Sequence, residues 1–315
     1  MASGQKIALN RPTHLYDAYV FDMDGTIYLG DNFLPGAKRL IEELRRRGIV
    51  VRFLSNNPTK NPQQYAEKLA RLGLPTPVGE IANTVVTTVR WLKRHYPQAT
   101  VYPIAEAPLI DAIREAGLKI SEDPAEIDIV IASYDRTFTY QKLQIAFDAL
   151  KFHQRAFLIA TNPDRFCPLP GGHGEPDCAA IVAAIEACTG CKCQTVIGKP
   201  NPSMLTEALG DALGDTLGGE PGEALEGSLT NVIMVGDRLS TDIAMAVNTG
   251  IVSAMPLTGE SQIPDVEALP ESERPTYILE RIDQLLPQAI WDELGWATGD
   301  EEVAAGSVAK TTGIA

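Results

Sequence analysis

Short apolar runs alternate with amphipathic segments along most of the chain. In residues 34–48, for example, Leu40, Ile41 and Leu44 share one helical face. This alternation predicts an α/β fold with a parallel sheet. Strands are predicted at residues 18–22, 49–57, 100–105, 127–133, 156–162, 231–237 and 251–257. Helices are predicted at residues 34–48, 61–73, 107–117, 139–152, 177–190, 203–210 and 240–250.

Local signals refine these boundaries. Asn61 is the expected N-cap of its helix, with Pro62 at the first helical position. Residues 214–227 are rich in Gly and Glu, which predicts an exposed loop or insertion of unknown role. The small and polar residues 299–315 are expected to be a disordered tail.

Composition and charge narrow the class of protein. The 315 residues carry a formal net charge of −14, which disfavours a nucleic-acid partner because such binding needs Lys and Arg on phosphates. A small phosphorylated ligand stays compatible with this charge. No apolar run approaches the roughly 18 residues of a membrane span, and the first residues lack the apolar block of a secretory signal. We therefore expect a cytoplasmic protein without membrane contact.

The five cysteines all fall within one short region. The CTGCKC run could suggest zinc, but it holds only three cysteines and has no histidine at ligand spacing. Ordinary reduced thiols are the favoured interpretation, with metal binding left open. The five are Cys167, Cys178, Cys188, Cys191 and Cys193.

Two acids follow the first buried strand, in the stretch YVFDMDGTIYLGD. Because side chains alternate along a strand, Asp22 and Asp24 are expected to share a direction at its carboxyl end. Two close carboxylates repel each other, which implies a divalent cation or a shared proton. Mg²⁺ is the natural candidate, since it prefers oxygen ligands. A chance acidic pair in a turn is the alternative for this stretch taken alone.

Three further stretches place polar residues after strands or in loops. Ser55 and Asn56 end the second strand with donors that suit an anionic oxygen. Lys199 lies in the IGKP turn and offers a point charge for a phosphoryl group. Asp237 and Asp242 follow an apolar strand, where they could hold a metal ion. The occurrence of all four stretches in this order makes chance an unlikely explanation.

The motifs DMDGT, SNN, GKP and GDRLSTD together resemble the four motifs of the haloacid dehalogenase superfamily. YLGD, TNPD and IGKPNPSM resemble its NagD-type branch, subfamily IIA, which includes p-nitrophenyl phosphatases and pyridoxal phosphate phosphatases. The resemblance covers approximately residues 17–285. It implies a Rossmann-like parallel-sheet core with an inserted α/β cap of the C2 type.

The resemblance also implies roles for individual residues. Asp22 would be the nucleophile that forms an aspartyl-phosphate, and Asp24 would be the general acid and base. Ser55 and Lys199 would hold the phosphoryl oxygens, and Asn56 would help to position that group.

The metal site implied by the resemblance binds Mg²⁺. Asp237 would bind it together with the Asp22 carboxylate and the Asp24 backbone carbonyl. Asp242 would support the metal, through water or as a neighbour of its ligands.

A separate domain explains the long interval between Ser55 and Lys199. The predicted core comprises residues 1–85 and 195–298, and the predicted cap comprises residues 86–194. By analogy, the cap closes over the site, and related phosphatases pair through it, so a homodimer is a further expectation.

Two loops of the cap are expected to contact the substrate's leaving group. Asn162, Asp164 and Arg165 are the candidates in the first loop, with His173 as a weaker one. Tyr134 and Asp135 are the candidates in the second. Solvent-exposed turns are the alternative for both loops.

The expected activity is Mg²⁺-dependent hydrolysis of small phosphomonoesters, such as sugar phosphates or nucleoside monophosphates. Asp24 favours phosphate esters over carbon–halogen bonds, because dehalogenation needs no acid to protonate an alkoxide. The stretch GGHGEPDCAA departs from the P-G-x-G-like element of the family, so substrate identity does not carry over. Two alternatives are phosphotransfer to another alcohol and a non-catalytic module that binds a phosphorylated metabolite.

Overall fold

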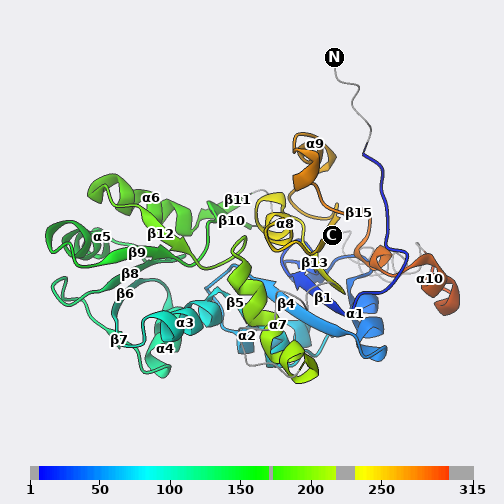
Figure 1. The fold of residues 1–315 in the computed structure, drawn as a ribbon, viewed down its shortest axis with the longest axis horizontal. Helices are drawn as coiled ribbons and strands as arrows, with labels where there is room; N and C mark the ends of the chain where they lie inside the picture. Colours follow the sequence, from blue (N-terminus) through cyan, green and yellow to red (C-terminus); the bar gives the residue numbers. More distant parts are fainter. Residues whose placement is uncertain (1–6, 170–172, 218–230, 298–315) are drawn as a thin grey trace, which may run out of the picture. The chain divides into compact units, whose positions relative to one another are not determined.

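The computed structural model describes residues 7–169, 173–217 and 231–297 (Figure 1). The chain forms two compact units, the first from residues 1–52 and 226–315 and the second from residues 53–225. The predicted division into core and cap, with boundaries at residues 86 and 194, stays a prediction. Within the described ranges, no helix is both long enough and apolar enough to cross a bilayer.

The first unit is built on a parallel sheet with the strand order β15-β14-β13-β1. β1 lies beside β13, with Ala18 opposite Val232 and Phe21 opposite Val235. The elements of this unit are β1 (Ala18–Asp22), β2 (Tyr28–Leu29), β3 (Asn32–Phe33), α1 (Ala37–Arg46), β13 (Val232–Val235), α8 (Ala244–Thr249), β14 (Val252–Pro256), α9 (Ile263–Glu267), β15 (Tyr277–Leu279) and α10 (Gln288–Leu294).

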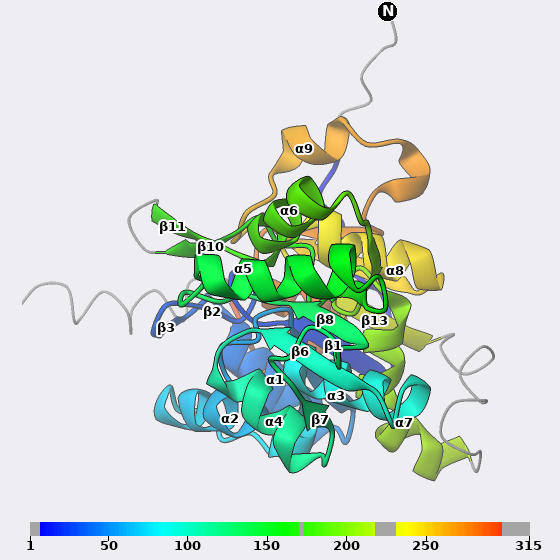
Figure 2. The same cartoon turned by 90° about the vertical axis from the view of Figure 1, so that its left-hand side faces the viewer.

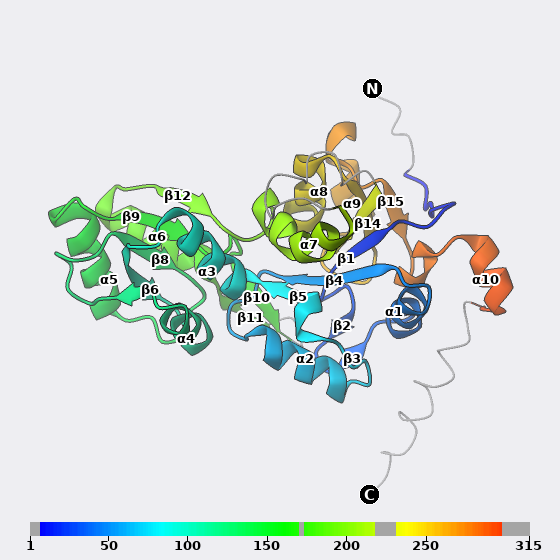
Figure 3. The same cartoon turned by 60° about the horizontal axis from the view of Figure 1, so that its bottom comes forward.

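Apolar patterning explains how the helices of the first unit pack. The predicted apolar face of α1 is fully buried at Leu40, Ile41 and Leu44. α9 lies near β14 and β15 (Figure 3). Val266 of α9 belongs to one buried cluster with Met255 of β14 and Ile278 of β15. β1 is buried from Ala18 to Phe21, as expected for an inner strand of a parallel sheet.

The second unit contains a five-stranded sheet with the order β12-β9-β8-β6-β7, all in parallel pairs. Strand β4 (Val50–Ser55) enters this unit from the first, and its end pairs in parallel with β5. The other elements are α2 (Pro62–Arg71), β5 (Ile81–Asn83), α3 (Thr84–His95), β6 (Thr100–Ile104), α4 (Ala107–Glu115), β7 (Lys119–Ile120), β8 (Ile129–Ala132), α5 (Tyr140–Phe147), β9 (Phe157–Ala160), β10 (Phe166–Leu169), β11 (His173–Pro176), α6 (Cys178–Thr189), β12 (Cys193–Val196) and α7 (Pro202–Leu217).

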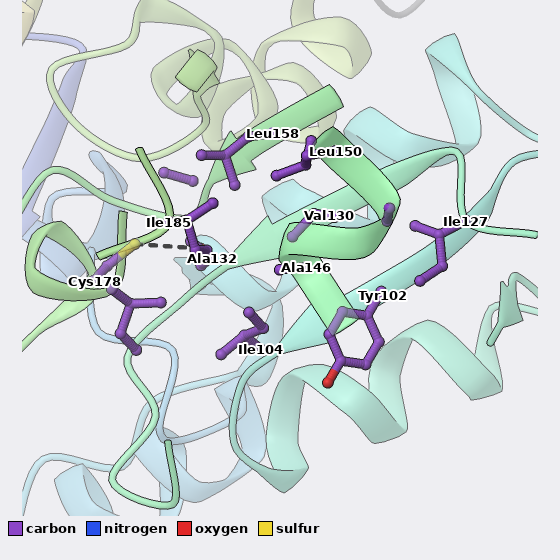
Figure 4. Close-up of a cluster of buried hydrophobic side chains, with 13 residues drawn as sticks. Tyr102, Ile104, Ile127, Val130, Ala132, Ala146, Leu150, Leu158, Cys178 and Ile185 are labelled. Atoms are coloured by element: carbon purple, nitrogen blue, oxygen red, sulfur yellow. Dashed lines mark hydrogen bonds between the residues drawn. The ribbon is translucent and has the colours of Figure 1, made fainter. Parts of the chain in front are cut away.

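Helices cover both faces of the five-stranded sheet. Ile129 and Ile131 of β8 belong to a cluster with side chains of α3 and α4. Val130 and Ala132, on the opposite face, belong to a cluster with side chains of α5 and α6 (Figures 2 and 4). A strand buried on both faces reads as a continuous apolar run, which is what the sequence of β8 shows. The α/β class with parallel sheets is therefore confirmed.

The predicted start of α2 is also confirmed. Asn61 is its N-cap and accepts a hydrogen bond from Gln64 N at 2.9 Å, while the Gln64 side chain accepts one from Asn61 N at 2.8 Å. This reciprocal capping box satisfies two backbone donors at the helix start.

Two predicted loops were wrong in part. α7 continues to Leu217, so residues 214–217 of the predicted loop are helical; no proline after Pro202 interrupts its backbone hydrogen bonds. The rest of that loop and the predicted tail at 299–315 lie outside the described residues. The predicted glycine-rich loop after β9 contains an antiparallel pair, β10 with β11, in which Phe166 lies opposite Pro176.

Candidate functional site

At the end of β1, burial alternates from one residue to the next. Met23 is fully buried, whereas Asp22 on one side of it is half-buried and Asp24 on the other is exposed. The Tyr28 hydroxyl donates to Asp24 Oδ2 at 3.5 Å. The two acids therefore lie away from the core that holds Met23, and Asp24 is open to water.

Three carboxylates of the first unit converge. One oxygen from each of Asp22, Asp237 and Asp242 lies within 4.8 Å of the other two. Asp237 follows β13 after Gly236, and Asp242 lies in the π-helical turn Leu239–Ile243. Asp24, which the sequence also assigned to the metal through its backbone carbonyl, contributes no carboxylate to this group.

Asp237 is held by short loops on two sides. Its Oδ2 accepts a hydrogen bond from Glu260 N at 2.7 Å, and its Oδ1 accepts one from Thr26 Oγ1 at 3.3 Å. A Cβ atom added to Gly25 would lie 2.6 Å from Asp237 Oδ2, and Gly25 has a φ of +89°. This position therefore requires glycine both for its backbone conformation and for the approach of the carboxylate.

Asp242 is fixed by its own turn. Arg238 N donates to Asp242 Oδ2 at 3.2 Å, and the side chain of Asp242 is fully buried. A Cβ atom added to Gly236 would fall 2.2 Å from Asp242 Cγ, so the carboxylate packs directly on the backbone that follows β13. The glycine before Asp237 thus makes room for the second acid.

The donor set of this group fits a small, hard divalent cation. All three donors are carboxylate oxygens, which suit Mg²⁺ and offer neither the sulfur nor the imidazole that zinc sites favour. A cation among the three would also offset their mutual repulsion. Asp22, Asp237 and Asp242 are the residues that could hold it.

In the second unit, Asn56 connects the end of β4 to the turn that carries Lys199. Asn56 Oδ1 accepts a hydrogen bond from Lys199 N at 2.8 Å, and Asn56 Nδ2 donates to Lys199 O at 3.1 Å. Both polar groups of the Asn56 side chain therefore bind the backbone of Lys199. Lys199 is 2% exposed, and a charged group at such depth needs oxygen partners.

Ser55 is held at the end of β4 by its neighbours. Its hydroxyl accepts a hydrogen bond from Asn57 N at 3.1 Å and lies 3.1 Å from the Tyr65 hydroxyl, with either oxygen able to donate. Ser55 is 4% exposed. Ser55, Asn56 and Lys199 are thus polar residues of one buried region of the second unit.

Gly198 allows the backbone before Lys199 to pack closely against Asn56 and Thr161. A Cβ atom there would lie 2.6 Å from Asn56 Oδ1 and 2.7 Å from Thr161 O. Gly198 N also donates to Thr161 O at 2.8 Å. The glycine before Lys199 is therefore required by the close approach of backbone and amide.

The structure places Asn162 in the same buried region. Its Nδ2 donates to Asn56 O at 3.2 Å, and its Oδ1 accepts a hydrogen bond from Asp164 N at 2.9 Å. Asn162 is fully buried, whereas Asp164 is half-buried and Arg165 and His173 are exposed. The substrate contacts predicted for these residues stay predictions.

The second predicted substrate loop is braced by ion pairs. Asp135 is buried and forms an ion pair with Lys142, and the Tyr134 hydroxyl donates to Glu175. Burial and that hydrogen bond raise the pKa of Tyr134. Arg136 donates to both Glu106 oxygens, at 2.6 and 2.7 Å.

The cysteines occupy different environments. Cys178 is fully buried and its thiol donates to Ala132 O at 3.2 Å; burial raises its pKa to about 12. Such a thiol is inert at neutral pH. Cys167 lies 3.9 Å from Asn57 Nδ2. Among the residues that the structure describes, the group able to hold a metal ion contains no cysteine.

Sequence reasoning missed several residues that shape both regions. Thr26 and Glu260 bind Asp237, and Thr84 Oγ1 donates to Asn56 O at 2.7 Å. Thr26 could have been found as part of the DMDGT motif. Nothing in the local sequence distinguishes Thr84 from the other threonines of α3.

Two family models match the chain, one described as haloacid dehalogenase-like hydrolase over residues 19–119 and one as HAD-hydrolase-like over residues 196–285. An acid sugar phosphatase of Staphylococcus aureus is 33% identical over 273 residues, which are 87% of this chain and 98% of that protein. These matches confirm the resemblance seen in the four motifs.

Solved structures similar to this chain also include phosphatases. A 4-nitrophenylphosphatase from Thermotoga maritima has a TM-score of 0.74 at 31% identity, covering 86% of this chain and 96% of that one. A glycerol phosphate phosphatase from Mycobacterium tuberculosis, solved in complex with magnesium, has a TM-score of 0.73 at 27% identity, covering 86% of this chain and 77% of that one.

Replacing Gly198 should destabilise the protein. In Gly198→Ala the new methyl group would collide with Asn56 Oδ1 and Thr161 O, so we expect the free energy of unfolding to fall by about 1–3 kcal/mol. Urea denaturation measures this change. Gly79→Ala is the matched control, because a Cβ atom there meets open space. Equal stabilities of the two variants would show that the backbone around Gly198 yields.

The Glu106–Arg136 pair should make stability depend on pH. The hydrogen bonds from Arg136 lower the pKa of Glu106 in the folded protein. A lowered folded-state pKa gives a contribution that is present above the unfolded pKa and lost as pH falls through the folded pKa. Wild type should therefore be more stable than Glu106→Gln at pH 7, and the difference should shrink as the pH falls below the ordinary glutamate pKa of about 4.3. Urea denaturation across this range tests it, and a constant difference would contradict it.

Proposed function

The chain belongs to the haloacid dehalogenase-like hydrolase family, and from this premise we propose that it is a Mg²⁺-dependent phosphatase of small phosphomonoesters. The observation that carries the proposal is the group of three carboxylates at the ends of β1 and β13. The named activities of the relatives, on sugar phosphates, nitrophenyl phosphate and glycerol phosphate, support this substrate class.

In the proposed mechanism Asp22 attacks phosphorus in line with the leaving oxygen. The bond from Asp22 to phosphorus forms as the ester bond breaks, which yields an aspartyl-phosphate. Asp24 donates its proton to the leaving alcohol and then takes a proton from the water that hydrolyses the intermediate. Its exposed side chain, two residues after Asp22, suits a group that exchanges protons with water.

The residues of the second unit are proposed to hold the transferred group. Lys199 contributes positive charge and Ser55 contributes its hydroxyl to the phosphoryl oxygens. Asn56 contributes indirectly, because both polar groups of its side chain bind the Lys199 backbone.

Mg²⁺, when bound by Asp22, Asp237 and Asp242, would supply positive charge that offsets the negative charge of the phosphoryl group. Glu260 N and Thr26 Oγ1 would hold the carboxylate of Asp237 in place as one of these ligands.

The proposal also concerns the oligomeric state, the location and the phosphoryl acceptor. Pairing of two copies through the cap and a cytoplasmic location stay predictions. Water as the acceptor is preferred to a second alcohol, because the relatives named above are all phosphatases. Product analysis with an added alcohol distinguishes hydrolysis from transfer.

Asp22→Asn should abolish turnover while the protein stays folded. The amide is a poor nucleophile, so phosphate release should fall at least about 10³-fold. A panel of sugar phosphates, glycerol phosphates, nucleoside monophosphates and p-nitrophenyl phosphate, assayed with Mg²⁺, measures this loss. Near-normal activity of the variant would remove the nucleophile assignment. A folded wild type that releases no phosphate from any member of the panel would refute the proposed function.

Asp237→Asn should weaken Mg²⁺ binding. Loss of one of three carboxylate charges should raise the Mg²⁺ concentration for half-maximal activity at least roughly tenfold. Titration calorimetry with Mg²⁺ gives a readout that does not need turnover. Asp265→Asn is the control, since this exposed acid of the first unit caps α9 and lies outside the group. Equal Mg²⁺ affinity of both variants would exclude Asp237 as a ligand.

A further inference from the structure

The backbone carbonyl of Asn56 receives hydrogen bonds from two other elements. Thr84 Oγ1, at the start of α3, donates to Asn56 O at 2.7 Å, and Asn162 Nδ2, after β9, donates to the same oxygen at 3.2 Å. A carbonyl oxygen has two lone pairs, so these two donors satisfy it. Because Thr84 and Asn162 are fully buried, water does not compete for these bonds.

The orientation of the Asn162 amide is set by its second contact. Asn162 Oδ1 accepts a hydrogen bond from Asp164 N at 2.9 Å, which directs the NH₂ group toward Asn56. The same NH₂ group lies 3.4 Å from Thr161 Oγ1. The polar atoms of Asn162 are therefore engaged within the protein, although the sequence places this residue in a loop expected to contact substrate.

Asn56 passes this restraint on to Lys199. The carbonyl of Asn56 is fixed from two sides, and its side chain holds both the N–H and the C=O of Lys199. The backbone of Lys199 therefore follows the position of Asn56. A misplacement of about 1 Å at a group that binds a transferred phosphoryl can lower the rate roughly 10²-fold.

We propose that Thr84 and Asn162 are positioning residues that fix Lys199 through Asn56. The inference rests on the proposed function, in which Lys199 binds the phosphoryl group. It assigns Asn162 an effect on phosphoryl binding instead of leaving-group recognition, and it adds Thr84, which lies outside the four motifs.

Isosteric variants test the two donors. Thr84→Val removes the hydroxyl and keeps the shape, whereas Thr84→Ser keeps the hydroxyl. Asn162→Asp keeps the oxygen that accepts from Asp164 N but loses the NH₂ donor. Thr84→Val and Asn162→Asp should each lower kcat/KM roughly tenfold, and Thr84→Ser should stay within about twofold of wild type.

The dependence on the leaving group separates the two roles of Asn162. A residue that acts through Lys199 should lower kcat/KM by a similar factor for p-nitrophenyl phosphate and for a sugar phosphate. It should also weaken inhibition by inorganic phosphate, which has no leaving group, by a similar factor. A loss confined to one leaving group, with the inhibition constant of phosphate unchanged, would overturn the inference for Asn162.

A double-mutant cycle tests the route through Lys199. In a Lys199→Met background, adding Thr84→Val should lower kcat/KM by less than a further factor of about two. The lysine side chain that Thr84 positions is already absent there. A further tenfold loss in that background would overturn the inference, as would a Thr84→Val single variant with wild-type kinetics.

Controls separate positioning from folding. Thr189→Ala removes another buried hydroxyl, which donates to Ile185 O at 2.7 Å. This variant should lower the melting temperature without changing the inhibition constant of inorganic phosphate. If wild type binds phosphate with Mg²⁺ in calorimetry but hydrolyses nothing, the proposed function fails and the phosphate affinities of the variants still decide this inference. A wild type that does neither overturns both.

Discussion

Repulsion among Asp22, Asp237 and Asp242 is the constraint on which the proposed chemistry depends. One oxygen of each lies within 4.8 Å of the other two; Asp22 ends β1, Asp237 follows the neighbouring strand β13, and Asp242 lies in the turn after it. Holding like charges this close costs free energy, which the surrounding backbone offsets through Glu260 N and the turn around Asp242. Glycines lie directly beside these carboxylates, because the carboxylates occupy the space that Cβ atoms would take.

The second unit holds Lys199 in place where almost none of the residue is exposed to water. Directional hydrogen bonds fix the backbone of this residue. Asn56 is suited to making these bonds because an amide offers a donor and an acceptor with fixed geometry, matched to a peptide unit. Apolar layers on both faces of the adjacent sheet provide the rigid support for these bonds.

Local chemistry made much of the fold and part of the site predictable. The strand that ends at Asp22 and the cap at Asn61 depend on neighbours in sequence, and both were found. α3 was missed because its first residues, TVVTTV, are all β-branched and favour strands, although Asn83 caps a helix there. The links from Asn56 to Thr84, Asn162 and Lys199 span 28, 106 and 143 residues, and no local pattern encodes such distances.

The two-sided burial of β8 has a consequence for how its alignment is encoded. A slip by one residue would exchange the set facing α3 and α4 with the set facing α5 and α6, yet both sets are apolar. Polarity within β8 therefore cannot specify the register of this strand. The volume difference between Ile131 and Ala132 can do so, together with the hydrogen bond from Thr100 N to Asp128 Oδ2 just before the strand. Substitutions that equalise these volumes would weaken the choice between alignments without adding a single polar atom to the interior.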